Sequence, residues 1–240
     1  MSAPLVTVLV THHLDENAKY LELCLESVKR QKGVDLEVIV LADTEHEPVV
    51  PEGFTLVHNR DLNTATKKVH FGIAMSDPRS KYFLLLSDDV IMGEVVLATL
   101  THTLGEGLAV MNPMSNSDNG GQFITSLPWP CNVELEAVAP HTIDQVKTFP
   151  LVVSRPYICF YCTLIPRKVW EMVGPLDERL ENRWNDVDYC KRAGQKGILS
   201  YIHFGCFALH FGSKTLDKVA PKELRDEASR VFMEKWPGAV

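Results

Sequence analysis

Apolar and polar positions along the chain repeat with two different periods. Short apolar runs rich in branched residues are typical of buried strands, and they alternate with segments in which apolar residues recur at helical spacing. We expect strands at 5–11, 36–42, 54–58, 81–87 and 107–112, and helices at 17–33, 65–73 and 94–104. This alternation predicts an α/β fold with a doubly wound, mostly parallel central sheet flanked by helices.

The second half of the chain is less regular. Residues 113–150 are rich in Pro, Asn, Ser and Gly, and we expect a loop or lid there. Strands are expected at 156–166 and 199–211, and helices at 167–174, 185–197 and 221–236, the last with Leu224, Ala228 and Val231 on one face. No internal repeat or linker interrupts the sequence, so residues 1–240 are expected to form a single domain.

The composition is that of an ordinary globular protein with an acidic balance. The 240 residues are 45% hydrophobic and carry a net charge of -7, from 24 basic and 31 acidic side chains. The broad basic field that nucleic-acid-binding proteins use is missing, which argues against nucleic acid as a partner without excluding a local basic patch. No apolar run is long enough to span a bilayer, and the N-terminus does not resemble a signal peptide. We therefore expect no transmembrane segment and a cytoplasmic location.

The cysteines fit a reducing compartment. Cys159 and Cys162 form a C-x-x-C pair, but they lie within an apolar run that is typical of a buried strand. A second pair at metal-ligand spacing is missing from the sequence. Small buried hydrophobic residues are therefore favoured over a zinc or redox site.

Polar side chains gather where three of the predicted strands end. Residues 11–13 end the first strand, Asp43 follows the second, and residues 87–89 end the fourth. Ligands of doubly wound sheets bind beyond the carboxyl ends of the strands, so these positions predict a binding rim. The adjacent carboxylates of Asp88 and Asp89 indicate either a hard divalent cation or a cap for the helix that follows. Their place on the shared rim favours the cation.

Five segments follow one another in an order that is specific only when they are taken together. They are CLESVKRQ (24–31), VIVLAD (38–43), YFLLLSDDV (82–90), VGPLDERLENRWNDVDYCKRAGQKG (173–197) and HFGSKT (210–215). With a loop at 112–122, this order resembles that of the family-2 glycosyltransferases with the GT-A fold. The resemblance covers nearly the whole chain.

The resemblance implies a glycosyltransferase that moves a sugar from a nucleoside-diphosphate donor to a hydroxyl acceptor with the help of Mn2+ or Mg2+. It implies that residues 1–112 bind the nucleotide sugar, that residues 113–215 bind the acceptor, and that residues 216–240 carry a C-terminal helix. The implied donor-binding residues are Thr11, His12, Asp43, Ser87 and Asp88, and the implied metal ligands are Asp89 and His210.

The resemblance also implies a general base and an acceptor site. Asp186 would take the proton of the acceptor hydroxyl, and Trp184 and Asn185 would contact an acceptor that is a glycan or glycoconjugate. A single displacement by the acceptor would invert the anomeric centre. Three departures stand out: Ser87 replaces an aspartate that is frequent in the family, residues 12–13 are histidines instead of Tyr-Asn, and Asn185 replaces the glutamate of a Glu-Asp pair.

Several of these residues also have a purely structural interpretation. Asp186 and Asp188 could both be acids of a helix N-terminus, and His210 could be a core histidine. The lysines at 67–68 could reach phosphate, although a solvated helix face is favoured. Trp129, between two prolines, predicts either a platform for sugar stacking or a packed loop anchor.

Two other functions are compatible with the same sheet. A nucleotidyltransferase would need a glycine-rich, basic phosphate loop after the first strand, and the segment THHLDEN contains neither glycine nor lysine nor arginine. A non-catalytic module that binds a nucleotide or a sugar would keep the rim without turnover. The Ser-Asp-Asp and Asn-Asp departures keep this second alternative open.

Overall fold

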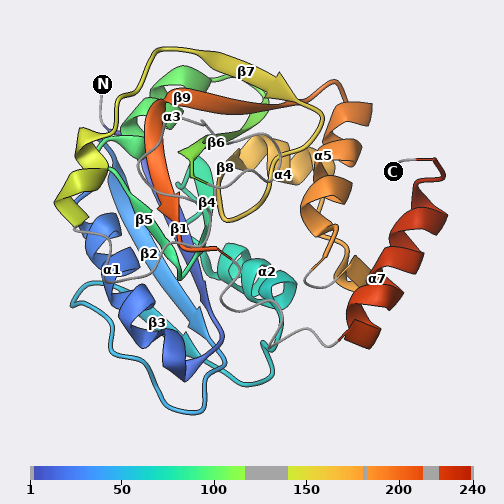
Figure 1. Cartoon of the computed structure of the whole chain (residues 1–240), viewed down its shortest axis with the longest axis horizontal. Coiled ribbons are helices and arrows are strands. Elements are labelled where there is room, and N and C mark those ends of the chain that lie inside the picture. The colour runs from blue at the N-terminus through green and yellow to red at the C-terminus, as the bar shows by residue number, and fades with distance from the viewer. Residues whose placement is uncertain (1–2, 117–139, 181–182, 213–221, 239–240) are drawn as a thin grey trace.

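A nine-stranded sheet runs through the centre of the protein (Figure 1). The computed structural model of the chain describes residues 3–116, 140–180, 183–212 and 222–238. The strands are β1 (Leu5–His12), β2 (Asp35–Ala42), β3 (Thr55–His58), β4 (Tyr82–Ser87), β5 (Val90–Met92), β6 (Ala109–Ser115), β7 (Val152–Arg155), β8 (Cys162–Pro166) and β9 (Leu199–His210). The helices are α1 (Ala18–Lys29), α2 (Ala65–Met75), α3 (Val96–Leu104), α4 (Arg167–Val173), α5 (Asn185–Gln195) and α7 (Lys222–Lys235), with 3-10 turns η1 (Asp15–Asn17), η4 (Pro140–Gln145) and η5 (Glu178–Leu180).

The strand order explains how the rim is built. It is β3-β2-β1-β4-β8-β6-β9-β5, and β7 pairs with β9. The N-terminal strands β3, β2, β1 and β4 are parallel, as the sequence predicts, whereas β8 joins β4 and β6 in antiparallel pairs, so the complete sheet is mixed. Thr11 of β1 lies opposite both Leu41 of β2 and Ser87 of β4. The carboxyl ends of these three strands therefore meet at one edge.

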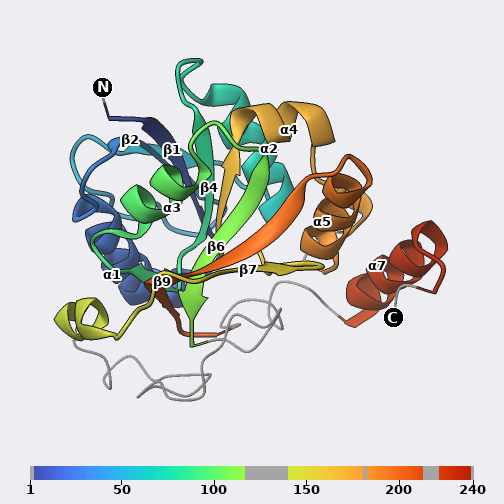
Figure 2. The ribbon, with the colours of Figure 1, turned by 90° about the horizontal axis from the view of Figure 1, so that it is seen from above.

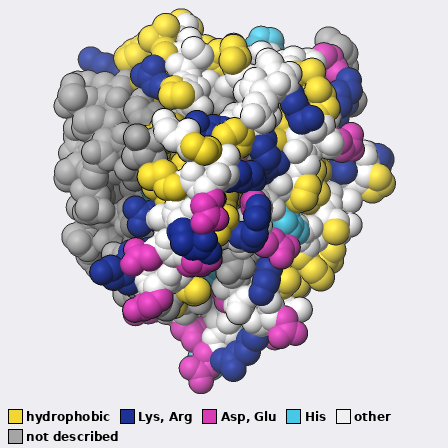
Figure 3. All heavy atoms as spheres, turned by 90° about the vertical axis from the view of Figure 1, so that its right-hand side faces the viewer, with side chains coloured by type: hydrophobic (Ala, Val, Ile, Leu, Met, Phe, Trp, Pro, Cys, Tyr) yellow, Lys and Arg dark blue, Asp and Glu magenta, His cyan; other side chains and the backbone are white. Residues whose placement is uncertain are grey.

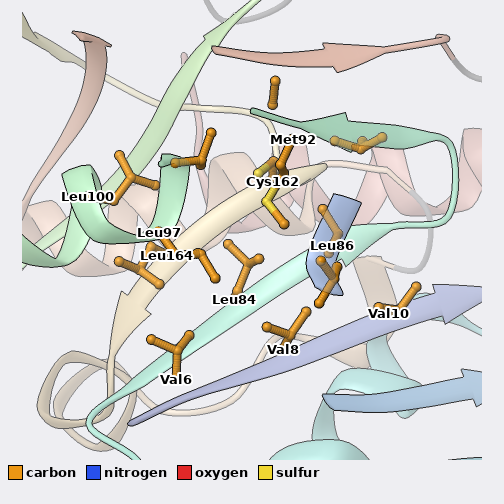
Figure 4. Close-up of a cluster of buried hydrophobic side chains, with 14 of the residues drawn as sticks. Val6, Val8, Val10, Leu84, Leu86, Met92, Leu97, Leu100, Cys162 and Leu164 are labelled. Carbon is orange, nitrogen blue, oxygen red and sulfur yellow. The ribbon is translucent and has the colours of Figure 1, made fainter. Parts of the chain in front are cut away.

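Helices cover both faces of the sheet (Figures 1 and 2), because the strands are apolar on both sides. On one face, α1 and α3 pack against a cluster that contains Val6, Val8 and Val10 of β1, and Figure 4 shows these side chains with their neighbours from β4 and β8. On the other face, α2, α4 and α5 pack against Leu9 and Leu41. Successive residues of β1 thus face opposite layers, as the pleat of a strand requires. The α/β fold class with a single domain is confirmed.

Helix α2 lies unusually close to the sheet because of one glycine. A Cβ atom at Gly72 would lie 2.7 Å from Leu9 Cδ2 and 2.9 Å from Leu41 Cδ1, which is too close for any larger residue without a shift. The helix begins after Thr64, whose hydroxyl accepts a hydrogen bond from the Lys67 amide at 3.2 Å. This close contact brings the N-terminal turns of α2 to the ends of β1 and β2.

Helix α7 lies beside α5 at one side of the domain (Figures 1 and 2). The buried carboxylate of Asp188 in α5 accepts from Arg192 Nε at 2.8 Å and from Trp236 Nε1 at 2.9 Å, and it pairs with Lys235 Nζ at 2.7 Å. Asp188 therefore has a structural role, as one interpretation of the sequence allows. The surface on this side carries acidic and basic side chains intermingled, not a uniform basic field (Figure 3).

Some elements differ from the sequence prediction. The strand expected at 156–166 is shorter, since β8 begins at Cys162, and the short strands β5 and β7 carry too little pattern to be predicted. The predicted face of α7 is wrong at Leu224, which is 53% exposed, and the helix instead buries Ala228 and Phe232. Within the described residues, no helix is both long and apolar enough to cross a membrane.

Candidate active site

The end of β2 carries Asp43, and a buried lysine holds its carboxylate. Lys68 of α2 is 0% exposed, so the prediction of a solvated helix face is wrong for this residue. Its Nζ lies 2.5 Å from Asp43 Oδ1, 2.7 Å from His13 Nδ1 and 2.7 Å from the carbonyl oxygen of His12. Burial raises the pKa of Asp43, but the hydrogen bonds from His13 and Lys68 outweigh it and lower the pKa below its ordinary value. Asp43 is therefore ionised at neutral pH.

The end of β4 is joined to β1 by a second buried pair. His12 Nδ1 lies 2.6 Å from Asp88 Oδ2, and the two residues are 1% and 3% exposed. Burial raises the pKa of Asp88, the hydrogen bond with His12 opposes this rise, and the charge of Asp89 adds to it. Because His12 engages Oδ2, a contact of Asp88 with a ribose or a sugar would use Oδ1. Thr11 and Ser87 lie half-buried between these two pairs.

Asp89 and His210 come together because β5 pairs with β9. Val90 lies opposite His210, and the Phe211 amide donates to the Asp89 carbonyl at 3.0 Å. Asp89 Oδ1 is 3.3 Å from His210 Nε2. Neighbouring ligands of an octahedral ion lie roughly 3 Å apart when each is about 2.1 Å from the metal. The two side chains therefore fit two positions around one divalent cation, with the oxygen and imidazole ligands that such ions accept.

The ring of His210 is fixed by its neighbours. It stacks on Tyr161 with centroids 4.4 Å apart, and Asn116 bonds both the amide and the carbonyl of the His210 backbone, at 2.8 and 2.9 Å. Its Nδ1 is buried and has no hydrogen-bond partner among the described residues. The stacking and the backbone hydrogen bonds hold the ring with Nε2 directed at Asp89, which is the orientation that a ligand sharing an ion with Asp89 would need.

The alternative in which the paired acids cap a helix is wrong. Strand β5 separates Asp89 from α3, which begins at Val96 and has no side-chain cap at Val95. The nearby amide of Glu94 is bonded instead to Asp144 Oδ1 at 2.8 Å. The side chains of residues 88–89 therefore do not cap α3.

Asp186 is the second residue of α5, and its side chain is half-buried. Its Oδ1 accepts from the Val187 amide at 2.7 Å. Burial raises the pKa of Asp186, and hydrogen bonds from backbone amides and from Cys159 only partly oppose this rise. Residues 159–161 run from this carboxylate to the tyrosine that stacks on His210. A carboxylate with a raised pKa is a stronger base than one in water.

The two predicted acceptor residues directly precede Asp186 in the chain. Asn185 Oδ1 accepts from the next backbone amide at 2.7 Å, and its Nδ2 is 3.5 Å from Thr66 Oγ1 of α2. Trp184 has a left-handed backbone with φ of 68°. Its indole donates to Ser229 Oγ at 3.0 Å and stacks on Phe232 with centroids 4.6 Å apart. Much of the indole therefore packs against α7, and an acceptor would contact the part that remains exposed.

Other predicted features lie elsewhere or outside the described residues. Trp129, most of the loop at 112–122 and the end of the HFGSKT segment are outside them. Within the described part of the chain, one group of three side chains is close enough to hold a metal ion, namely Asp15, Glu45 and His46, and all three are exposed. Exposed acidic groups are common without an ion, so we favour the buried pair at the rim.

Two residues that shape the rim, Tyr161 and Lys68, are not predicted as such by the sequence. The sequence places Tyr161 within a strand and favours a solvated helix face for Lys68. The one signal for Lys68 is its position four residues before Gly72, which places both on the same side of α2. That signal requires knowing that Gly72 faces the sheet.

The sheet order, the helices on both faces and the acidic rim define a GT-A-like fold, which is the fold of a class of glycosyltransferases. A crystal structure of GalNAc-T7 with UDP, GalNAc and Mn2+ is similar to the chain, with a TM-score of 0.64 and 13% sequence identity. The alignment covers 85% of this chain and 42% of that chain, so the protein spans less than half of that neighbour's length. At this identity the likeness shows the fold.

Comparison by sequence, unlike comparison by structure, identifies no similar protein. No family model matches the chain, and no curated protein matches it. Membership of glycosyltransferase family 2 therefore stays a prediction.

Proposed function

We propose that the protein is a metal-dependent glycosyltransferase that moves a sugar from a nucleoside-diphosphate donor to a hydroxyl acceptor. The observation that carries this proposal is the Asp89–His210 pair, whose ligand atoms are 3.3 Å apart at the edge of the sheet that also carries Asp43 and Asp88. The structural likeness to GalNAc-T7, crystallised with UDP, GalNAc and Mn2+, supports the same class of donor and metal.

Asp89 and His210 would hold the Mn2+ or Mg2+ ion, which as a Lewis acid offsets the charge on the leaving diphosphate. Asp43, ionised and held by Lys68, would bind the base or ribose of the donor. Asp88 would contact the ribose or the sugar. Thr11, His12 and Ser87 would complete the donor side of the rim.

Asp186 is the proposed general base. It would take the proton from the acceptor hydroxyl as that oxygen attacks the anomeric carbon, a contribution of about 10²–10⁴-fold in rate. Its raised pKa supports this role. Base and metal ligands come from separate segments, which lets them flank the anomeric carbon, and one displacement would invert its configuration. Trp184 and Asn185 would contact the acceptor, which we propose is a glycan or glycoconjugate.

Nucleotide binding is the first test. UDP and GDP, each with Mn2+ or with EDTA, are added to the wild-type protein and the melting temperature is measured, because a ligand of the folded state raises it by mass action. We expect one nucleotide to stabilise the protein only with metal. The Asp89→Ala variant should lose this shift, whereas Asp15→Ala, in the exposed acidic group, should keep it. About 1 mM nucleotide is enough to detect even a dissociation constant in the millimolar range. If the melting temperature of the wild type does not change at that concentration, the proposal is overturned.

Turnover is the second test. Donor hydrolysis should be metal-dependent in the wild type, and Asp186→Asn should bind nucleotide normally but lose turnover. The anomeric configuration of the product, read by NMR, tests the inverting step. Binding of nucleotide without turnover of any donor or acceptor would favour the non-catalytic module.

A further inference from the structure

Lys68 is the most completely buried charged side chain at the rim. Its side chain is 0% exposed, and its ammonium group contacts three acceptors, one from Asp43 and one each from His12 and His13. Lys67, which precedes it in α2, instead donates from Nζ to Asn63 Oδ1 at 2.8 Å, and this hydrogen bond is exposed. The two lysines are adjacent in sequence, but only one reaches the strand ends.

The contacts of Lys68 match the hydrogen-bonding capacity of an ammonium ion. An ammonium has three donors and no acceptor, and the three neighbouring atoms are a carboxylate oxygen, a carbonyl oxygen and a ring nitrogen. His13 Nδ1 lies 2.7 Å from the ammonium and 3.1 Å from Asp43 Oδ1, so it accepts from the lysine in one tautomer and donates to the carboxylate in the other. Burial lowers the pKa of His13, which agrees with a neutral ring.

Burying this charge is costly for folding alone. Apolar side chains in place of both Lys68 and Asp43 would fill the same space without removing two charges from water, and such replacements of a buried ion pair are often neutral or stabilising. Gly72 permits the approach, since α2 can lie this close to Leu9 and Leu41 only without a Cβ atom there. A costly charge at a ligand-binding edge is more readily explained by the ligand than by packing.

We infer that Lys68 is a positioning residue for the donor nucleotide: it holds Asp43 through Oδ1, keeps Oδ2 directed toward the nucleoside, and thereby sets nucleotide affinity. This inference rests on the proposed function, because Asp43 matters in this way only if a nucleotide binds there. Lys68 is buried and does not touch the ligand, so it acts through Asp43 and the end of β1.

If Lys68 acts through its charge, nucleotide affinity should depend on its protonation state. A lysine that only fills space would give no such pH dependence. Burial lowers the pKa of Lys68 to about 8, while Asp43 and, at longer range, Asp88 oppose this shift. The titratable groups around it are these two carboxylates and the ring of His13. When the ammonium loses its proton, Asp43 loses its counter-charge, so nucleotide affinity should fall as the pH rises through that range.

The test is calorimetric titration of UDP or GDP with Mg2+, from about pH 7 to about pH 9, against the wild type, Lys68→Met and the matched control Lys67→Met. We expect Lys68→Met to weaken binding at pH 7 by about tenfold or more, the effect of one hydrogen bond to a charged group. Lys67→Met should bind like the wild type. The wild-type dissociation constant should rise with pH, and that of Lys68→Met should not.

A double-mutant comparison shows whether the lysine acts through Asp43. Adding Lys68→Met to Asp43→Asn should weaken binding no further, because the carboxylate that the lysine positions is already gone. Wild-type affinity and pH dependence in Lys68→Met would overturn the inference. Should that variant not fold, a flat wild-type profile between about pH 7 and about pH 9 would overturn it as well. If the wild type binds neither nucleotide, the proposed function itself fails.

Discussion

Two aspartates in the first turn of α5 look alike in sequence but have opposite surroundings, and they offer a sharp test of the structure. Asp188 is fully buried and bonded to Arg192, Lys235 and the indole of Trp236. Asp186 is half-buried and has no ion pair among the described residues. We consider the isosteric changes Asp188→Asn and Asp186→Asn, which remove one charge each without changing volume.

Asp188→Asn should destabilise the protein. Removing one partner of a fully buried ion pair costs about 3–5 kcal/mol. Here the side chains of Arg192 and Lys235 are 18% and 27% exposed, so water can partly solvate them after the change. We therefore expect a loss of about 2–4 kcal/mol in the free energy of unfolding, with screening reducing the upper figure. For a chain of this size that corresponds to a fall of about 4–16 °C in melting temperature.

Asp186→Asn should have the opposite profile. Its pKa is raised in the folded state, so its charged form is disfavoured by folding. A carboxyl group with a raised pKa stabilises the fold below its unfolded pKa and loses that contribution as the pH rises. At neutral pH the neutral amide should therefore leave stability unchanged or slightly increased. Turnover should fall by about 10²–10⁴-fold if Asp186 is the general base.

Both variants can be measured by urea unfolding followed by tryptophan fluorescence, with donor turnover measured on the same samples. Trp236 donates to Asp188, so its emission reports directly on the docking of α7. The reasoning fails if Asp188→Asn unfolds at the wild-type urea midpoint. It also fails if Asp186→Asn keeps wild-type turnover, or if it loses as much stability as Asp188→Asn.

Three further predictions follow from the same structure. Asp89→Ala and His210→Ala should each abolish the Mn2+-dependent rise in melting temperature with nucleotide, because each removes one of the two facing ligands; persistence of the shift in both variants would contradict the metal site. The folded-state pKa of Lys68 is about 8, below its ordinary value of 10.5, so deprotonation favours the folded state. Stability relative to Lys68→Met should therefore rise between these two pH values by up to about 3 kcal/mol, which urea midpoints across that range can measure; a constant difference would be evidence against a buried ammonium. Gly72→Ala should cost about 1–2 kcal/mol, since overpacking outweighs the better helix propensity of alanine. Gly194→Ala in α5, with nothing within 4 Å of its Cβ position, is the matched control and should be neutral or stabilising in the same unfolding assay.

The strands that carry the rim could be predicted because their pattern is local. The runs that became β1, β2 and β4 are apolar on both faces, and a polar residue marks the end of each. Parallel order then brings Asp43, Asp88 and Asp89 to one edge without further information. By contrast, β5 has three residues and pairs with β9, more than 100 positions away along the chain. That His210 lies beside Asp89 could therefore be predicted from the family resemblance but not from the hydrophobic pattern.

The burial of Lys68 could not be predicted from local sequence for a related reason. The three groups that it contacts lie at or just after the carboxyl ends of β1 and β2, and they come together only when those strands lie side by side. Trp184 shows the same limit, because its packing partners Ser229 and Phe232 belong to α7 at the far end of the chain. A helix face predicted from spacing alone fails where tertiary contacts satisfy a charge, as at Lys68, and where the tertiary structure leaves an apolar residue exposed, as at Leu224.

The three rim carboxylates have different partners, and in the proposed site this difference would separate the two ends of a nucleotide. Asp43 faces the ammonium of Lys68, whereas Asp88 faces the imidazole of His12 and Asp89 that of His210. A fixed ammonium beside Asp89 would repel a divalent cation, but an imidazole can be neutral and share it. The buried positive charge of Lys68 would thus lie at the proposed nucleoside end, where it holds Asp43. At the proposed diphosphate end the positive charge would come from the exchangeable ion held by Asp89 and His210, so nucleotide binding should require metal even though a lysine lies on the same rim.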